Sequence, residues 1–241
     1  MHHLLLSTAS VIVLVLLDAD SAARAQQVVA NGTTQTASGT INTGVLPPTA
    51  GYALYSLNGG VIQSSSPLTL RTGGAGSHAA VAESGGTINI FSGSSITTTG
   101  TNASGLAATG INSAITAANF TLSATNFGSF GAGADDGAVI NVNGGTITSV
   151  SSALRVGNGG TINATNVNAT ATGANAIGVN ANNGTINLTG GSVTALVGTG
   201  DTGINASGGG SVVASGVSAN ALGNGVQASP TVHCPPPMAR S

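Results

Sequence analysis

A short phrase that recurs along the chain constrains its fold more than any other feature. The clearest copy is Gly85-Gly86-Thr87-Ile88-Asn89-Ile90, a glycine turn followed by alternating polar and apolar residues. The other copies, two of them weaker, begin at Gly59, Gly144, Gly159, Asn183 and Gly209. Such self-similarity marks a solenoid, whose repeats bury their apolar faces only against their neighbours. We therefore expect a stacked scaffold that serves chiefly as a surface, which makes an enzymatic role less expected.

The spacing of these copies matches one coil of a parallel β-helix. Between second turn residues, the step from Gly60 to Gly86 is as long as the step from Gly184 to Gly210, and the step from Gly160 to Gly184 is slightly shorter. After each corner, the alternation at a two-residue period indicates a strand with one buried face. Three short strands per coil then give an all-β parallel β-helix over residues 58–228.

The repeat is irregular in its middle. The stretch from Gly86 to Gly145 is long enough for two coils with a loop, with Gly110-Ile111-Asn112-Ser113 as an eroded corner. The next interval, from Gly145 to Gly160, is much shorter than one coil. We therefore expect the register between coils to be imperfect at this point.

Stacked copies of the phrase predict columns of apolar side chains inside the helix. The column directly after the glycine corner contains Ile62, Ile88, Ile147, Ile162, Ile186 and Val212. A second column, from the strand before the corner, contains Tyr55, Val81, Ile140, Val179 and Ile204. A third, from a later strand of the coil, contains Ile96, Val167, Val193 and Val217. Because no strand buries its apolar face alone, stability must come from neighbouring coils.

The composition fits narrow coils and excludes several classes of protein. Only 4% of the residues are charged while 41% are hydrophobic, the opposite of a typical disordered chain. Arg71 and Arg155 are the only Arg or Lys residues between Gln26 and Ser229, so nucleic acid is not an expected partner. The neutral, β-rich composition also favours self-association edge to edge.

Residues 1–25 have the pattern of a secretory signal peptide. An apolar run from Leu4 to Leu17 precedes Ala23-Arg24-Ala25, which has the small-residue spacing that signal peptidase cleaves. The run is shorter than the roughly 20 residues that span a bilayer. We therefore expect secretion, with cleavage after Ala25.

The two ends of the mature chain depart from the repeat. Residues 26–57 are rich in Thr, Gly and Asn and include Pro47-Pro48, which predicts an irregular lead-in or an N-terminal cap. Residues 229–241 are an atypical Pro-rich tail, because consecutive prolines cannot donate to a sheet. The single cysteine, Cys234, lies in this tail, so neither an internal disulfide nor a cysteine zinc site is expected.

The coils resemble a known family of surface proteins. Residues 178–187 and 203–210 have the form Gly-Ile/Val-x-Ala followed by a glycine-rich corner. Behind a signal peptide, this pattern is similar to the passenger region of pertactin-like autotransporters of Gram-negative bacteria. The resemblance covers about residues 50–228. It implies a right-handed single-stranded parallel β-helix, secreted across the inner membrane and located at the cell surface, at the outer membrane or outside the cell.

The resemblance also implies a C-terminal outer-membrane β-barrel as the translocator, and this sequence lacks the barrel pattern. Barrel strands alternate over about ten residues and carry aromatic girdles. The chain has only two Tyr and four Phe. We therefore expect a truncated passenger, whose barrel partner is absent from this chain.

Few residues are available for chemistry. The acids between the signal and the tail are Glu83, Asp135, Asp136 and Asp201, and the only histidine there is His78. Asp135 and Asp136 would point to opposite faces of a strand, so we interpret them as a solvated loop. His78 is interpreted as an exposed turn residue. No catalytic, cofactor-binding or metal-binding residue is assigned, and no cofactor is expected.

These observations predict a non-enzymatic surface protein that presents an extended face for adhesion or surface coating. The sequence does not specify its ligand on a host or neighbouring cell. Two alternatives stay open. One is a β-helical carbohydrate-active enzyme, which would need paired carboxylates, and the other is a self-assembling extracellular matrix protein.

Overall fold

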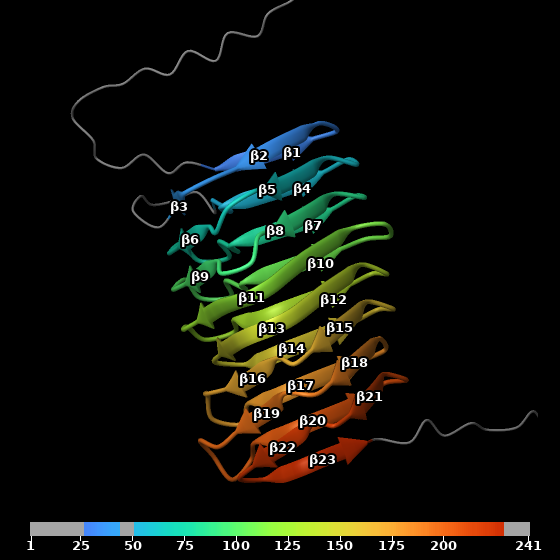
Figure 1. The fold of residues 1–241 in the computed structure, drawn as a ribbon. Helices are drawn as coiled ribbons and strands as arrows, with labels where there is room; N and C mark the ends of the chain where they lie inside the picture. The colour runs from blue at the N-terminus through green and yellow to red at the C-terminus, as the bar shows by residue number, and fades with distance from the viewer. Residues whose placement is uncertain (1–26, 44–50, 229–241) are drawn as a thin grey trace, which may run out of the picture.

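The computed structural model describes residues 27–43 and 51–228, and this part of the chain is a parallel β-helix (Figure 1). Its 23 strands stack in parallel, and none of the described residues is helical. The predicted all-β, parallel β-helical class is therefore confirmed. The predicted signal peptide, residues 1–25, and the Pro-rich tail, residues 229–241 with Cys234, lie outside the described residues.

Each coil places strands on three faces. The first face is a sheet of nine strands. Its members are β1 (Val28–Asn31), β4 (Leu54–Leu57), β7 (Ala80–Glu83), β10 (Leu106–Thr109), β12 (Phe130–Asp135), β14 (Ser152–Gly157), β17 (Ile177–Asn182), β20 (Thr202–Ser207) and β23 (Asn224–Ala228).

The other two faces form one sheet of 14 strands, because the 11-residue strands β11 (Ala114–Ala124) and β13 (Val139–Ser149) run through the corner between them. The rest of the second face is β2 (Thr34–Ala37), β5 (Val61–Ser64), β8 (Thr87–Ile90), β15 (Thr161–Thr165), β18 (Thr185–Thr189) and β21 (Ser211–Ser215). The rest of the third face is β3 (Thr40–Asn42), β6 (Thr69–Thr72), β9 (Ser95–Thr98), β16 (Asn168–Ala171), β19 (Ser192–Ala195) and β22 (Ser218–Ala221).

A column of β-branched side chains fills the inside of the second face. Its isoleucines are fully buried, and its members in order are Ile62, Ile88, Ile115, Ile140, Ile162, Ile186 and Val212. The sequence prediction is confirmed for this column except at three residues. It omits Ile115, it places Ile140 in another column, and it wrongly includes Ile147.

Ile147 belongs to the third face, where it pairs with Leu122 and Ala169. The physical reason is that Gly144-Gly145 lies at the corner between the second and third faces, inside β13. Gly190-Gly191, before β19, lies at the same kind of corner, whereas the other copies of the recurring phrase lead into the second face. This difference also explains the short interval from Gly145 to Gly160.

The predicted third column is right in part. Ile96 and Val193 share the third-face column with Leu122 and Ile147. Val167 and Val217 directly precede β16 and β22, so they lie at the corner before that face.

The predicted second column mixes side chains that point into the helix with side chains that point out of the first face. Val179 and Ile204 point inward, in register with Leu154. Tyr55 and Val81 pair with each other one residue further along the strand, on the outer side. Because side chains alternate at a period of two, a shift of one residue reverses the face that a side chain occupies.

Glycine and asparagine form the corners before the second face for two reasons. Asn58 and Asn183 have φ values of 53° and 54°, the left-handed conformation that asparagine accepts most readily after glycine. At Gly160, a Cβ atom would lie 2.2 Å from the carbonyl oxygen of Ala134 in the preceding coil. The coils therefore stack too closely at this corner for any larger residue.

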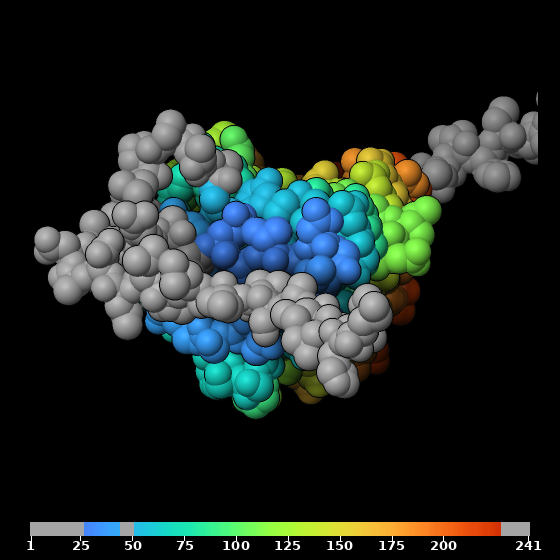
Figure 2. All heavy atoms as spheres, turned by 90° about the horizontal axis from the view of Figure 1, so that it is seen from above, coloured from blue at the N-terminus to red at the C-terminus, as the bar shows by residue number. Residues whose placement is uncertain are grey.

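The regular coils begin earlier than expected. Residues 28–42 contain three strands, β1 to β3, that pair in parallel with β4 to β6. The stretch predicted as an irregular lead-in or cap, 26–57, thus contains the first coil of the solenoid. Figure 2, seen from the N-terminal end of the stack, shows these strands in blue nearest the viewer, with later coils behind them.

Candidate functional site

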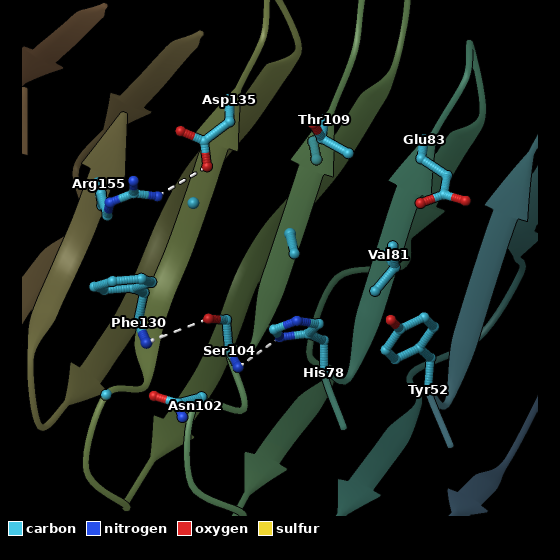
Figure 3. A pocket seen from close by; sticks show the side chains of 14 residues that line it. Tyr52, His78, Val81, Glu83, Asn102, Ser104, Thr109, Phe130, Asp135 and Arg155 are labelled. Atoms are coloured by element: carbon cyan, nitrogen blue, oxygen red, sulfur yellow. Dashed lines mark hydrogen bonds and ion pairs between the residues drawn. The ribbon is translucent and has the colours of Figure 1, made fainter. Parts of the chain in front are cut away.

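The outer side of the first face carries a groove of about 530 Å³, which extends from Tyr52, just before β4, across β7, β10 and β12 to β14. Its floor consists of small side chains, since Val81, Ala107 and Gly133 follow one another in register. Longer polar and aromatic side chains surround this floor (Figure 3). A volume of this size lies within the range of small-molecule sites in proteins.

Two tyrosines lie at the N-terminal end of the groove. The rings of Tyr52 and Tyr55 meet edge to face, with centroids 5.2 Å apart. The Tyr55 hydroxyl donates a hydrogen bond to Glu83 Oε1. This bond, burial and the negative charge of Glu83 together raise the pKa of Tyr55 to about 12. The phenol therefore stays protonated and holds the Glu83 carboxylate in place.

His78 forms part of one wall and stacks on Tyr52, with ring centroids 5.5 Å apart. Its Nδ1 accepts a hydrogen bond of 2.8 Å from the backbone N–H of Ser104. Burial lowers the pKa of His78, so the imidazole is neutral near pH 7 and carries its proton on Nε2. The sequence interpretation of an exposed turn residue is wrong, because the side chain is half-buried between two coils.

An ion pair closes the C-terminal end of the groove. Arg155 Nη1 lies 2.8 Å from Asp135 Oδ2, and the two side chains are 33% and 29% exposed. The guanidinium also lies over the ring of Phe130, 4.9 Å from its centroid. At Gly157, a Cβ atom would come within 2.4 Å of Asp135 Oδ1, so this glycine leaves room for the carboxylate.

The opposite wall is a row of polar residues in register. Glu83 pairs with Thr109, and Thr109 pairs with Asp135. Two strand spacings separate the backbones of the two acids by about 9.5 Å. Asp135 ends β12, whereas Asp136 starts the following turn with a φ of 54° and accepts a hydrogen bond from Thr109. The interpretation of both aspartates as a loop is therefore right only for Asp136.

Asp201 is the remaining acid among the described residues, and it lies away from the groove. Its side chain is fully buried, and its oxygens accept hydrogen bonds from the backbone N–H groups of Val197, Gly198 and Ala176. Burial opposes its ionisation, but these backbone bonds outweigh burial and lower its pKa. Asp201 thus fixes the loop before β20 to the neighbouring coil.

The groove concentrates the rare residues of this chain. Three of the six charged side chains in the described ranges line it: Glu83, Asp135 and Arg155. Both tyrosines and the only histidine of those ranges lie at its N-terminal end. No group of three or more potential metal ligands occurs in residues 27–43 and 51–228. In the same ranges, no helix is long and apolar enough to cross a membrane.

The sequence motifs do not bring these residues together. The period of the coils carries the one signal that could, because Tyr52, His78 and Ser104 are spaced by one coil each. Glu83, Thr109 and Asp135 show the same spacing. Using that signal requires a register across residues 86–145, where the glycine phrase is eroded.

Comparisons with protein-family models, with curated proteins and with solved structures gave no match. The likeness to autotransporter passengers therefore rests on the repeat and on the β-helical fold.

Proposed function

We propose that this chain is the exported passenger of an autotransporter-type surface protein. In this proposal it acts without catalysis and uses the groove on its first face to adhere to a host or neighbouring cell. The observation that carries the proposal is the gathering of charged and aromatic side chains around one groove, on a solenoid with few others. The scaffold itself does not require charges on an outer face, so a binding role accounts for them best.

The proposed location is outside the inner membrane. The predicted signal, residues 1–25, supplies export, and an outer-membrane β-barrel supplied separately would tether the passenger. The parallel β-helix supports this proposal because every coil folds against the one before it. Such a chain can fold progressively as it emerges from a pore, without waiting for distant segments.

The proposal is tested by expressing the full chain in a Gram-negative host and fractionating the cells. We expect the product outside the inner membrane, with an N-terminus at Gln26. The purified product, labelled on its single cysteine, Cys234, should bind saturably to epithelial or bacterial cells. Retention of residues 1–25 on a cytoplasmic product would contradict export, and unsaturable binding to all cell surfaces would contradict adhesion.

One observation favours a second candidate, a β-helical glycoside hydrolase. Glu83 and Asp135 face the same groove from strands two positions apart, and most glycoside hydrolases act with a pair of carboxyl groups at one site. Against this candidate, Asp135 is paired with Arg155 and Glu83 accepts from Tyr55, so neither carboxyl is arranged as a proton donor. New reducing ends in polysaccharide incubated with the protein, lost in Glu83→Gln, would favour the enzyme.

A further inference from the structure

We infer that the groove binds an elongated, uncharged oligosaccharide. The inference deepens the proposed function and rests on it, since it names the chemistry of the adhesive ligand. Four features of the groove support it: its shape, its mixture of hydrogen-bonding groups, its charge and the pairing of the strands beneath it.

The shape suits an extended ligand. The groove runs from Tyr52, in the coil of β4, to Arg155 in β14, which is four strand spacings or about 19 Å. Its floor is low because the residues between these ends are Val81, Ala107 and Gly133. At Gly133 a Cβ atom would find no atom within 4 Å, so this part of the floor is open. A chain of sugar rings fits such a trough better than a compact ligand does.

The polar groups present both donors and acceptors along the trough. The Nε2–H of His78 and the guanidinium of Arg155 donate, whereas the carboxylates of Glu83 and Asp135 accept. A sugar hydroxyl can donate and accept at the same time, so closely spaced groups of both kinds suit it. The rings of Tyr52 and His78 add apolar surface for the C–H face of a pyranose.

The charge disfavours acidic polymers. Two carboxylates and one guanidinium leave the groove with one formal negative charge, because His78 is neutral. The guanidinium of Arg155 is already paired with Asp135. Uronic acid chains, sulfated glycans and nucleic acids would therefore meet the Glu83 carboxylate without a free compensating cation.

The backbone disfavours an extended peptide. Peptides commonly bind sheets by adding a strand at an unpaired edge, where main-chain hydrogen bonds supply the affinity. Strands β7, β10 and β12 under the groove are each paired on both sides. These strands therefore have no free edge to which a peptide could add as a further strand, and hydrogen bonds to the ligand have to come from the side chains around the groove.

The chain contains its own reporter for this interaction. It has no Trp and only two Tyr, and both tyrosines lie at the groove. Intrinsic tyrosine fluorescence of the full chain can be followed during titration with maltohexaose, cellohexaose, xylohexaose or mannohexaose, and with hexagalacturonate as the charged comparator. We expect saturable change with at least one neutral oligosaccharide and weaker binding of hexagalacturonate.

A matched pair of glycine variants tests the location. Gly133→Leu fills the floor of the groove, and Gly225→Leu adds the same side chain in β23, where a Cβ atom also meets nothing within 4 Å. Gly133→Leu should weaken binding about tenfold or more, while Gly225→Leu should leave the affinity unchanged. Glu83→Ala, which removes an acceptor instead of adding bulk, should also weaken binding. This variant keeps the test valid if Gly133→Leu does not fold.

Three results would overturn the inference: no saturation with any neutral oligosaccharide, tighter binding of hexagalacturonate, or wild-type affinity in both Gly133→Leu and Glu83→Ala. Cell adhesion is measured separately with the same proteins. Adhesion that persists in Gly133→Leu would refute the groove as the adhesive site while leaving the proposal of an exported passenger untouched. Oligosaccharide binding by a product that is never exported would refute the passenger proposal alone.

Discussion

The first face has two different outer surfaces along its length. From β4 to β14, long polar and aromatic side chains surround a floor of small residues. On β17 and β20 the outer side carries Asn180 and its register partner Asn205, whose amide donates to Asn180 at 2.9 Å. These two asparagines satisfy each other along the stack, whereas the groove residues surround a space. Coils with the same inward columns can therefore carry either a self-paired surface or a surface open to a ligand.

The same contrast separates two aspartates. Asp201 is fully buried and its carboxylate accepts bonds from three backbone N–H groups. Asp135 is about a third exposed and has a single partner, Arg155. A carboxylate surrounded by backbone donors is part of the scaffold, and one held at the edge of a groove can contact a ligand. Removing each should therefore affect stability very differently.

The largest effect is expected at Asp201. Asp201→Ala leaves three backbone donors without their acceptor in a buried loop, which should lower the free energy of unfolding by about 4 kcal/mol. Urea denaturation followed by circular dichroism measures the loss. The isosteric Asp201→Asn should lose less, because its amide oxygen still accepts hydrogen bonds. A change below about 1 kcal/mol in Asp201→Ala, no more than one ordinary hydrogen bond contributes, would show that solvent replaces the carboxylate there.

Acid should reveal the same group. Because the pKa of Asp201 is lowered in the folded chain, its contribution to stability is complete above the unfolded value of 3.8. That contribution is lost as the pH falls through the lower, folded value. The free energy of unfolding of the wild type should therefore fall below about pH 3.8, and that of Asp201→Asn should fall less. An equal loss of stability in the two proteins as the pH falls would contradict this assignment.

The second-face column could be predicted from the sequence where the corner phrase leads into that face, and the prediction failed at Ile147, whose glycine pair lies at the next corner. Ile62, Ile88, Ile162 and Ile186 all follow a glycine or Asn-Gly corner, and all lie in the inward column. Ile115 was not found, because Gly110-Ile111-Asn112-Ser113 replaces the glycine pair before it. The rule depends on a local backbone conformation, so it fails where other residues adopt that conformation.

The groove could not be predicted because it depends on register over several coils. His78 and Ser104 meet only when residues one full coil apart are stacked, and Arg155 meets Asp135 across a shorter step. The coils change length at this point, since the step from Ala132 to Leu154 is shorter than the step from Leu106 to Ala132. A fixed repeat length therefore places Arg155 on the wrong part of the face.

A smaller effect is expected from paired glycine substitutions, which compare the corner with the groove floor. In Gly160→Ala the new Cβ would lie 2.2 Å from the carbonyl oxygen of Ala134, so the coils must move apart, at a cost of about 2–3 kcal/mol. In Gly133→Ala the Cβ enters open space, and stability should be unchanged or higher by about 0.5 kcal/mol. Equal melting temperatures in the two variants would refute the close contact at the corner.

The smallest effect is expected from the groove ion pair. Asp135 and Arg155 are each about a third exposed, and solvent screens such pairs, so their coupling should be below about 1 kcal/mol. A double-mutant cycle with Asp135→Asn and Arg155→Met measures this coupling in urea, and added salt should reduce it further. Arg155→Met also keeps an apolar side chain over Phe130, so the cycle reports the charges more than the packing.

A coupling well above the range of solvent-exposed pairs would make this pair part of the scaffold, like Asp201, and would remove the distinction between the two aspartates. A small coupling together with weaker oligosaccharide binding in Asp135→Asn would instead assign the pair to the ligand.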